Sequence, residues 1–384
     1  MKKTTKRKWI VAAVLLALAA APLAGCEGQT AQQKESKEQA GQDGKAEESG
    51  ETVYDQKLIA MAQQGFETEI DCEPIELSLG CSGTVDGTAR GDAIYAAIEA
   101  AKEWTDGKFT VNFYPGGQLG EDSDLIKGVQ LGSIDLFTGS STAQSGLIRE
   151  LSVLDICGLY ADLDSANEVL AEFQETLQPY YQDAGLALLS MYAPDFRILT
   201  SDRPVRTAAD LSGLKIRTQD NPYQMAFWRA LGADPDALAF GELYMALSQG
   251  ELNAQENSWD TIAGAGLAKV QGYAVETNHI PFIITFVMNR ERYDEMSEGQ
   301  KLACSQFITF CLRYHLAAAK EDDVRLAKLC ETEYGMETVP VSGEIRAMYG
   351  AAAESVIGLL KESLDPELVD RYVRAAKKGA GSGQ

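Results

Sequence analysis

The chain has 384 residues, of which 45% are hydrophobic and 24% are charged, and its formal net charge is −23. This composition is typical of a globular protein rather than a disordered or membrane-embedded one. Nucleic acid is excluded as a partner, because its binding depends on a Lys/Arg-rich stripe that the body of the chain lacks. The only His residues are His279 and His315, and the seven Cys form no CxxC pair. The sequence therefore offers few ligands for a metal site and few candidates for the His of a Ser-His-Asp hydrolase.

Residues 1–25 have the pattern of a secretory signal. Five Lys and Arg residues come first, the 13 apolar residues from Trp9 to Ala21 follow, and small residues come last. A membrane-spanning helix needs ~20 apolar residues, so cleavage is favoured over a retained span. The sequence from Leu23 to Cys26, LAGC, resembles a bacterial lipobox, in which Cys26 would be lipidated. The alternative is a soluble secreted protein whose cleavage site happens to precede a Cys.

Residues 26–70 are expected to form a flexible tether. No Val, Ile, Leu, Met or aromatic residue occurs from Glu27 to Thr52, and such a stretch cannot bury enough apolar surface to fold. Loss of residues 1–25 would leave 29 basic and 57 acidic residues, a net charge of −28. The electrostatic field of such a negative chain repels anions, so an anionic ligand would need a local, preorganised cation.

Strands and helices alternate from about residue 70 onward, which is the pattern of an α/β fold. About 310 ordered residues are too many for a single hydrophobic core of the usual size. We therefore expect two α/β lobes with a cleft between them. In chain order, the predicted strands are Ile75–Leu79, Phe109–Tyr114, Ile134–Phe137, Leu186–Tyr192, Arg197–Thr200, Leu214–Arg217, Leu252–Gln255 and Ile280–Met288. The predicted helices are Thr88–Trp104, Asp122–Gln130, Ala166–Asp183, Pro222–Leu231 and Glu242–Gln249, and residues 291–377 are mostly helical.

The first lobe is expected to comprise residues 71–195, with about 281–322 returning to it. The second lobe is expected to comprise residues 196–280, with about 323–378 packing on it. The strand Ile280–Met288 is nearly all apolar, so we expect burial on both faces. Its late position indicates that the chain crosses between the lobes more than once. Export would permit disulfides among the six Cys after Cys26, but their spacing specifies no pairing, and buried free thiols are the alternative.

Arg217 is the leading candidate for a binding residue on spacing alone. It ends a predicted strand, and in open α/β sheets the carboxyl ends of strands face the ligand crevice. Asn221-Pro222 opens the next helix, whose N-terminal amides also favour an anion. A strand-end Arg beside a helix N-terminus would clamp a carboxylate through paired hydrogen bonds. The alternative is an Arg in a surface ion pair.

Two long segments resemble one known family. Residues 213–280 contain GLKIRTQDN, FWRALGADPDALAFGELYMALSQGELNAQENSWDTI and TNHI, and residues 114–136 read YPGGQLGEDSDLIKGVQLGSIDL. These motifs are similar to those of DctP-type solute-binding proteins of TRAP (tripartite ATP-independent periplasmic) transporters, over roughly residues 75–380. The resemblance implies a two-lobed periplasmic-binding-protein fold, type II-like, with a mostly helical C-terminal region. It also implies no enzymatic activity, no cofactor and no metal.

The resemblance assigns roles to particular residues. Arg217, in LKIR, matches the family Arg that pairs with the ligand carboxylate, and Arg197, in PDFRILT, matches a second Arg at the cleft. Asn257, in AQEN, matches a ligand-contacting Asn, and Phe240, in LAFGELY, matches an aromatic residue that packs against the ligand. Further candidates for the cavity wall, each with an ordinary loop or core position as the alternative, are Gln219, Trp259, Ser82, Thr84, Thr138 and Ser140.

The expected protein is extracytoplasmic and held to the cell membrane by the lipid on Cys26. It would capture a small organic acid and deliver it to the membrane subunits of a TRAP transporter. The alternative is a ligand-sensing or adhesive surface lipoprotein on the same fold, without a transporter partner. The loop after the first strand, GCSGTVDGTARGD, lacks a clear polar signature of the family, so the sequence does not predict which acid binds.

Overall fold

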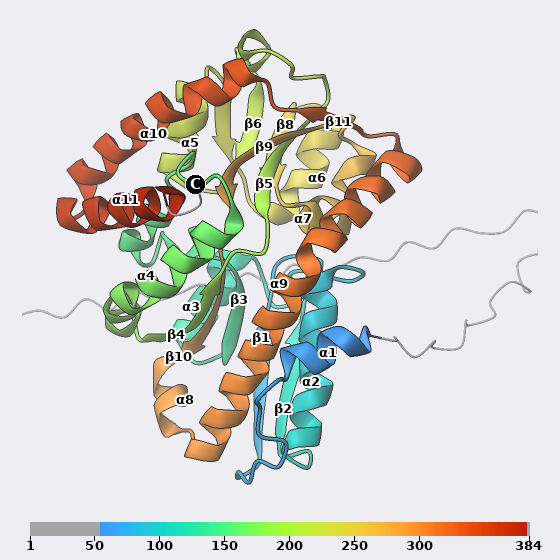
Figure 1. Ribbon diagram of the computed structural model, residues 1–384, viewed down its shortest axis with the longest axis vertical. Coiled ribbons are helices and arrows are strands. Elements are labelled where there is room, and N and C mark those ends of the chain that lie inside the picture. The colour runs from blue at the N-terminus through green and yellow to red at the C-terminus, as the bar shows by residue number, and fades with distance from the viewer. Residues whose placement is uncertain (1–53, 382–384) are drawn as a thin grey trace, which may run out of the picture. The chain divides into compact units, whose positions relative to one another are not determined.

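The computed structural model describes residues 54–381, which form two β-sheets flanked by helices (Figure 1). The predicted signal peptide, Cys26 and the predicted tether up to residue 53 lie outside the described residues. The α/β fold class is confirmed, because strands and helices alternate along most of the described chain. Among residues 54–381, no helix combines the length and the apolar character that crossing a bilayer requires.

The first lobe is built on a five-stranded sheet with the order β2-β1-β3-β10-β4. Strands β1, β2 and β3 are parallel, and β10 is antiparallel to both of its neighbours. Because the parallel strands end at one edge, the loops that follow them meet there. The strands are β1 (Ile75–Gly80), β2 (Phe109–Tyr114), β3 (Leu136–Ser140), β4 (Leu186–Tyr192) and β10 (Ile284–Asn289). The helices packed on them are α2 (Ala89–Trp104), α3 (Asp122–Gln130), α4 (Leu163–Asp183) and α8 (Arg290–Glu295).

The second lobe is built on a six-stranded sheet with the order β11-β9-β5-β8-β6-β7. Strand β6 is parallel to β7 and β8, whereas β5 is antiparallel to β8 and β9. The strands are β5 (Phe196–Ser201), β6 (Lys215–Thr218), β7 (Asp234–Ala237), β8 (Ala254–Asn257), β9 (Tyr273–Pro281) and β11 (Glu337–Pro340). The helices of this lobe are α5 (Pro222–Ala230), α6 (Phe240–Ser248), α7 (Trp259–Gly264) and α10 (Gly343–Ser363).

The chain connects the two lobes at three places. Strand β4 leads to β5, strand β9 leads to β10, and α9 (Glu298–Tyr334) packs on α2 in one lobe and on α7 in the other (Figure 1). The predicted repeated crossing is therefore confirmed. The single strand predicted over Ile280–Met288 is wrong, because these residues form the end of β9 and most of β10, which belong to different sheets. The segment is apolar apart from Thr285, because the end of β9 and the whole of β10 are buried.

Two predicted boundaries differ from the structure. The tether does not extend to residue 70, because α1 (Gln56–Ala62) packs on α9, and the ring of Phe66 lies 5.4 Å from that of Trp104. From Tyr54 onward, apolar side chains pack against the core of the first lobe. At the other end, α11 (Pro366–Gly381) packs on α4 of the first lobe and not only on the second lobe.

The cysteines of the described chain are unpaired. Six thiols are free and buried, namely those of Cys72, Cys81, Cys157, Cys304, Cys311 and Cys330. Of the two alternatives that the sequence left open, the structure shows buried thiols that serve as small apolar side chains in the packing.

Candidate functional site

A cavity of about 430 Å³ lies between the two sheets, at the carboxyl ends of their parallel strands. The first lobe contributes the loop after β1, the end of β3 and the start of α3. The second lobe contributes the segments that follow β6 and β7, together with the end of β8. Ligands of open α/β sheets bind at this edge, so the strand-end position predicted for Arg217 leads to the cavity.

Arg217 lies on β6 with its side chain in the cavity wall and only 4% of the residue exposed. Its Nε and Nη2 atoms both donate to the carbonyl oxygen of Leu238, at 2.9 and 2.7 Å, which fixes the plane of the guanidinium. Within residues 54–381, no carboxylate forms an ion pair with it. Burial, and the positive charge of Arg197, lower the pKa of Arg217 to about 10, so it stays charged at neutral pH. The cavity therefore holds a rigid cation that has no ion-pair partner among residues 54–381.

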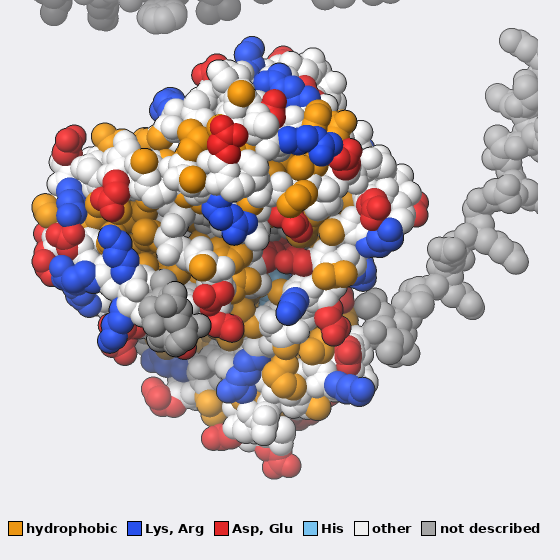
Figure 2. All heavy atoms as spheres, turned by 45° about the horizontal axis from the view of Figure 1, so that its top comes forward, with side chains coloured by type: hydrophobic (Ala, Val, Ile, Leu, Met, Phe, Trp, Pro, Cys, Tyr) orange, Lys and Arg blue, Asp and Glu red, His pale blue; other side chains and the backbone are white. Residues whose placement is uncertain are grey.

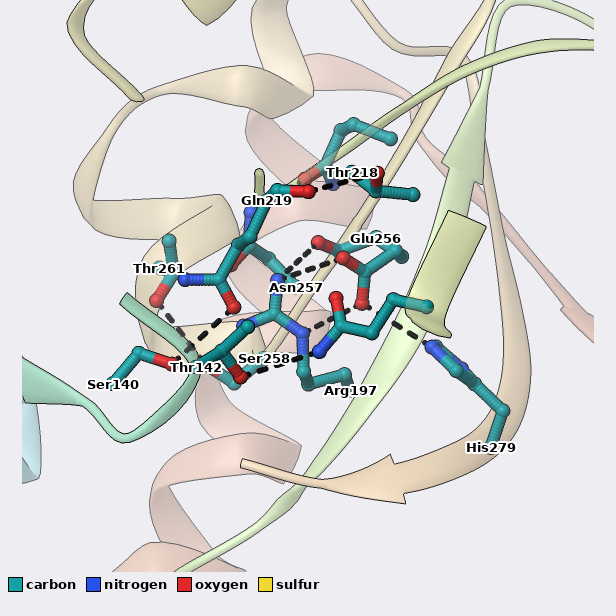
Figure 3. Close-up of polar contacts among 12 residues, drawn as sticks. Ser140, Thr142, Arg197, Thr218, Gln219, Glu256, Asn257, Ser258, Thr261 and His279 are labelled. Atoms are coloured by element: carbon teal, nitrogen blue, oxygen red, sulfur yellow. Dashed lines mark hydrogen bonds and ion pairs between the residues drawn. The ribbon is translucent and has the colours of Figure 1, made fainter. Parts of the chain in front are cut away.

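Arg197, on β5, also lines the cavity, but its charge is already paired (Figure 3). Its Nε and Nη2 atoms lie 2.6 and 2.9 Å from the carboxylate oxygens of Glu256, and Nη2 also donates to the Glu256 carbonyl at 2.6 Å. Nε2 of His279 lies 3.2 Å from the same carboxylate. Burial acts to raise the pKa of Glu256, but Arg197 and His279 outweigh it and lower the pKa to about 2. The two arginines that the sequence singled out thus differ in their electrostatic state.

Five more predicted residues line the cavity, namely Ser82, Ser140, Gln219, Phe240 and Asn257. The hydroxyl of Ser140 donates to the side-chain carbonyl of Gln219 at 3.2 Å, a hydrogen bond that joins the two lobes across the cavity (Figure 3). The amide of Asn257 donates to Gln255 at 2.6 Å, which holds the orientation of its side chain. Ser82 and Ser140 thus belong to the wall of the first lobe, and Gln219, Phe240 and Asn257 belong to the wall of the second.

Three predicted wall residues do not line the cavity. Trp259 is buried in the apolar core of the second lobe, where it packs beside α6 and α7. Thr138 is fully buried within β3, and only its carbonyl takes part in the site, as an acceptor for Arg90. Thr84 is exposed, and its carbonyl faces Gly264 of α7. The type and chain position of each of these residues are compatible with the wall of a cavity. The direction in which each side chain points, however, depends on the tertiary packing.

The N-terminus of α5 does not add to the anion site as predicted. The side chain of Asn221 caps this helix and accepts hydrogen bonds from the amides of Tyr223 and Gln224 at 2.9 and 3.1 Å. Its own amide group donates to the buried carboxylate of Asp155 at 2.7 Å. These amides are therefore occupied by the cap and are not free to bind a ligand.

The sequence did not predict four charged residues of the cavity wall, namely Arg90, Glu121, Asp122 and Asp220. Arg90 lies in the first turn of α2, a helix with eleven buried positions, and it is itself buried. The sequence did contain a signal for Arg90, because the helical period places this Arg on the buried face of the helix. Asp122 begins α3 and accepts a hydrogen bond from Ser82 at 2.6 Å, while burial raises the pKa of its carboxyl.

The net charge of the protein does not steer an anion toward this cavity. On the face shown in Figure 2, acidic and basic side chains are interspersed and no basic stripe is visible. The formal net charge of −23 opposes the approach of an anion. An anion could therefore be held only by short-range contacts inside the cavity.

Comparisons with known proteins agree with this geometry. Residues 86–362 match the family described as bacterial extracellular solute-binding protein, family 7, or DctP. A solute-binding protein of Roseobacter denitrificans is 31% identical over 277 residues, which are 71% of this chain and 84% of that relative. The solved sugar acid binding protein of Advenella mimigardefordensis, in complex with galactonate, has a TM-score of 0.76 and 26% identity, covering 80% of this chain and 100% of that chain. A TRAP periplasmic solute-binding protein of Desulfovibrio salexigens, with bound orotic acid, has a TM-score of 0.72 and 25% identity, covering 79% of this chain and 99% of that chain.

The family match includes both motifs on which the resemblance rested, and the similar structures cover the two lobes together. The predictions of a two-lobed solute-binding fold and of a binding protein rather than an enzyme are confirmed. The chain belongs to the DctP family of bacterial extracellular solute-binding proteins, the family that serves TRAP transporters.

Proposed function

We propose that this protein binds a small organic acid in the cavity between the lobes, with the acid's carboxylate held by Arg217. The observation that carries the proposal is that Arg217 is buried, charged and without a carboxylate partner in the described chain. A buried charge without a partner is costly, and a ligand carboxylate would offset that cost with directional hydrogen bonds. Galactonate and orotic acid, found in two similar proteins, both carry a carboxylate.

The test is a calorimetric titration of the wild-type protein and of Arg217→Ala. A thermal-shift screen of carboxylic acids first identifies a ligand, because a ligand that binds only the folded state raises the melting temperature. We expect Arg217→Ala to weaken binding by about tenfold or more, since a charge-assisted bidentate contact is lost. Arg229→Gln is the matched control, because Arg229 is exposed on α5. An unchanged dissociation constant for Arg217→Ala would refute the assignment.

We further propose that the mature protein is anchored in the membrane by a lipid on Cys26 and delivers its acid to TRAP membrane subunits. The LAGC sequence and the apolar-free stretch after it support the anchor. Replacement Cys26→Ser is expected to move the protein from the membrane fraction to the soluble fraction of fractionated cells, as detected by immunoblotting. Retention of the variant in the membrane would contradict lipid anchoring.

Delivery has its own test, which separates transport from sensing or adhesion. Membrane vesicles that carry the transporter subunits should take up the radiolabelled acid only when this protein is added. Arg217→Ala should lower uptake at limiting acid in proportion to its loss of affinity. Uptake that is independent of the protein would exclude the delivery role while leaving acid binding intact.

A further inference from the structure

Two segments of the cavity wall, one from each lobe, are joined by a second contact that lies outside the cavity. In the first lobe, Ser140 lines the cavity and Thr142 follows it in the chain. In the second lobe, Gln219 lines the cavity and Asn221 follows it. The Ser140 hydroxyl donates to Gln219 at the cavity (Figure 3), whereas Thr142 and Asn221 both donate to Asp155, which does not line the cavity. The same two segments are therefore linked twice.

Asp155 ends the short helical segment Arg149–Asp155, and its carboxylate accepts three hydrogen bonds. Oδ1 accepts from the Thr142 hydroxyl at 2.6 Å and from Nε2 of Gln224 at 3.0 Å, and Oδ2 accepts from Nδ2 of Asn221 at 2.7 Å. Thr142 follows β3 of the first sheet, whereas Asn221 and Gln224 belong to the start of α5 in the second lobe. One carboxylate thus holds side chains from both lobes.

This cluster is closed to solvent. Asp155 is 1% exposed, and its three donors, Thr142, Asn221 and Gln224, are buried as well. Among residues 54–381, no cation pairs directly with the carboxylate, and Arg197 acts on it only through space. Burial raises the pKa of Asp155 to about 7, although the three donors and Arg197 lower it. Because a buried carboxylate without an ion-pair partner is costly, packing alone does not explain an Asp at this position.

Each side of the cluster is tied to its own lobe. In the first lobe, the turn that contains Thr142 is held by Gln144, which donates to the Ser140 carbonyl at 3.1 Å and to a β10 hydroxyl at 2.7 Å. In the second lobe, the Asn221 side chain caps α5, and its backbone amide donates to the Gln219 carbonyl at 2.7 Å. Movement of the cluster would therefore reach both segments of the wall.

The acidic residues of the cavity wall are arranged differently. Glu121, Asp122 and Asp220 line the cavity, whereas Asp155 does not. Glu121 accepts from a backbone amide of α6 at 3.4 Å, and Asp122 accepts from a serine of its own lobe at 2.6 Å. Asp220 is exposed. Asp155 differs from these three acids because it is buried away from the ligand space and holds side chains of both lobes.

We propose that Asp155 is a positioning residue of the binding site, which sets the Ser140–Gln219 contact so that the walls of both lobes face the acid in the correct geometry. This inference rests on the proposed function, because it takes the acid to bind in the cavity. Asp155 does not touch the acid and acts through the two wall residues. Binding residues keep their geometry only when neighbouring packing and hydrogen bonds support them, and Asp155 provides that support here.

The experiment measures acid binding by calorimetry with the full mature protein. The probe is galactonate or orotate, the acids found in two similar structures, or the acid of the thermal-shift screen that binds most tightly. We expect Asp155→Ala to weaken binding about fivefold or more, because three buried donors lose their common acceptor. Asp155→Asn should give a smaller loss, since it keeps one carbonyl acceptor. Melting curves verify that each variant is folded, and Asp155→Asn replaces Asp155→Ala throughout if the latter does not fold.

A double-mutant cycle with Gln219→Ala separates positioning from a general loss of stability. If Asp155 acts through Gln219, the loss of affinity caused by Asp155→Ala should be at least about threefold smaller when residue 219 is already Ala. A role in stability alone would give the same loss in both backgrounds.

Asp135→Asn is the matched control. Asp135 is another hydrogen-bonded carboxylate of the first lobe, which accepts from the Ser78 hydroxyl at 2.8 Å and does not line the cavity. Its replacement should lower the melting temperature and change the affinity for the acid less than about twofold. A loss of affinity equal to that of Asp155→Ala would show that any weakened carboxylate contact has this effect, and would contradict the positioning role.

The outcomes separate the two proposals. An affinity that is unchanged by both Asp155 substitutions, or a loss that is the same with and without the Gln219 side chain, would overturn the positioning role. If binding in that case still depends on Arg217, the proposed function stands while this inference fails. If the wild-type protein binds no acid of the screen, the proposed function is contradicted, and the positioning role falls with it.

Discussion

Glu256 balances the buried Arg197 and orients it beside the cavity through two contacts to its carboxylate. We expect Glu256→Gln to lower the free energy of unfolding by about 3–5 kcal/mol, because it leaves a buried cation without its partner. Urea unfolding followed by fluorescence measures this change. The control is Glu337→Gln, which removes an exposed partner of Arg206 and should cost about 0–1 kcal/mol. Equal costs for the two substitutions would show that the buried pair contributes no more than a surface pair.

The same carboxylate predicts a pH dependence of stability. The pKa of Glu256 is lowered from 4.5 to about 2 in the folded protein, so below pH 4.5 the unfolded chain binds a proton that the folded protein does not. Its stabilising contribution is therefore complete above this range and is lost as the pH falls toward 2. The difference in unfolding free energy between the wild-type protein and Glu256→Gln should narrow from about pH 5 to about pH 2. A constant difference in urea titrations across this range would contradict the pKa assignment.

Among the elements, α9 is the longest, with 37 residues, and its two ends have well-defined caps. Ser297 and Gln300 form a capping box at the start, and Gly335 ends the helix with a φ of 71°. Hydrogen bonds from the amides of Gly335 and Met336 to Glu331 and Cys330 close the last turn. This left-handed end directs the chain into β11, which joins the second sheet.

We expect Gly335→Ala to lower the free energy of unfolding by about 1–2 kcal/mol, because a Cβ disfavours positive φ. Gly350→Ala should have the opposite sign and raise it by up to about 1 kcal/mol, since Ala is the better helix former. Gly350 is exposed inside α10, and an added Cβ would meet nothing within 4 Å. Thermal and urea unfolding measure both variants. The same sign for the two substitutions would mean that the helix end does not depend on its left-handed residue.

At the scale of the whole molecule, the two lobes contact each other at more than one place. Besides the Ser140–Gln219 hydrogen bond, the loop after β1 lies directly against α7, where a Cβ on Gly264 would come within 2.6 Å of the Thr84 carbonyl oxygen. The Thr84 carbonyl is part of the backbone, so it cannot move aside as the end of a flexible side chain could. A glycine is therefore required for the lobes to approach this closely.

Gly264→Ala is expected to weaken acid binding by about threefold or more, because it disfavours the closed arrangement in which both walls reach the ligand. Calorimetry measures the affinity, and small-angle scattering should show a larger radius of gyration for the variant. Gly272→Ala is the control, since Gly272 is exposed and an added Cβ would have nothing within 4 Å. The same affinity and the same radius for both variants would contradict a role for this contact in closure.

The elements that the sequence predicted well are those with a clear local pattern. Strand Phe109–Tyr114 ends at Pro115-Gly116-Gly117, and its predicted bounds are those of β2. Strand β7 was missed because its sequence, DPDA, has little strand propensity. It is a strand because it pairs with β6 in parallel at the edge of the sheet. Local pattern cannot reveal a strand whose stability comes from its neighbour.

The sequence by itself determined the secretory pattern, the alternation of strands and helices, and the strand-end position of Arg217, since each depends on residues close together in the chain. Only the tertiary structure decided which cavity arginine is paired, because the Arg197–Glu256 contact joins residues 59 positions apart. It also decided that Arg90 reaches the cavity, because α2 packs on β2 and α9 and the Arg90 guanidinium donates to the Thr138 carbonyl of β3. A side chain's charge is set by its residue type, but what compensates that charge depends on contacts between distant parts of the chain.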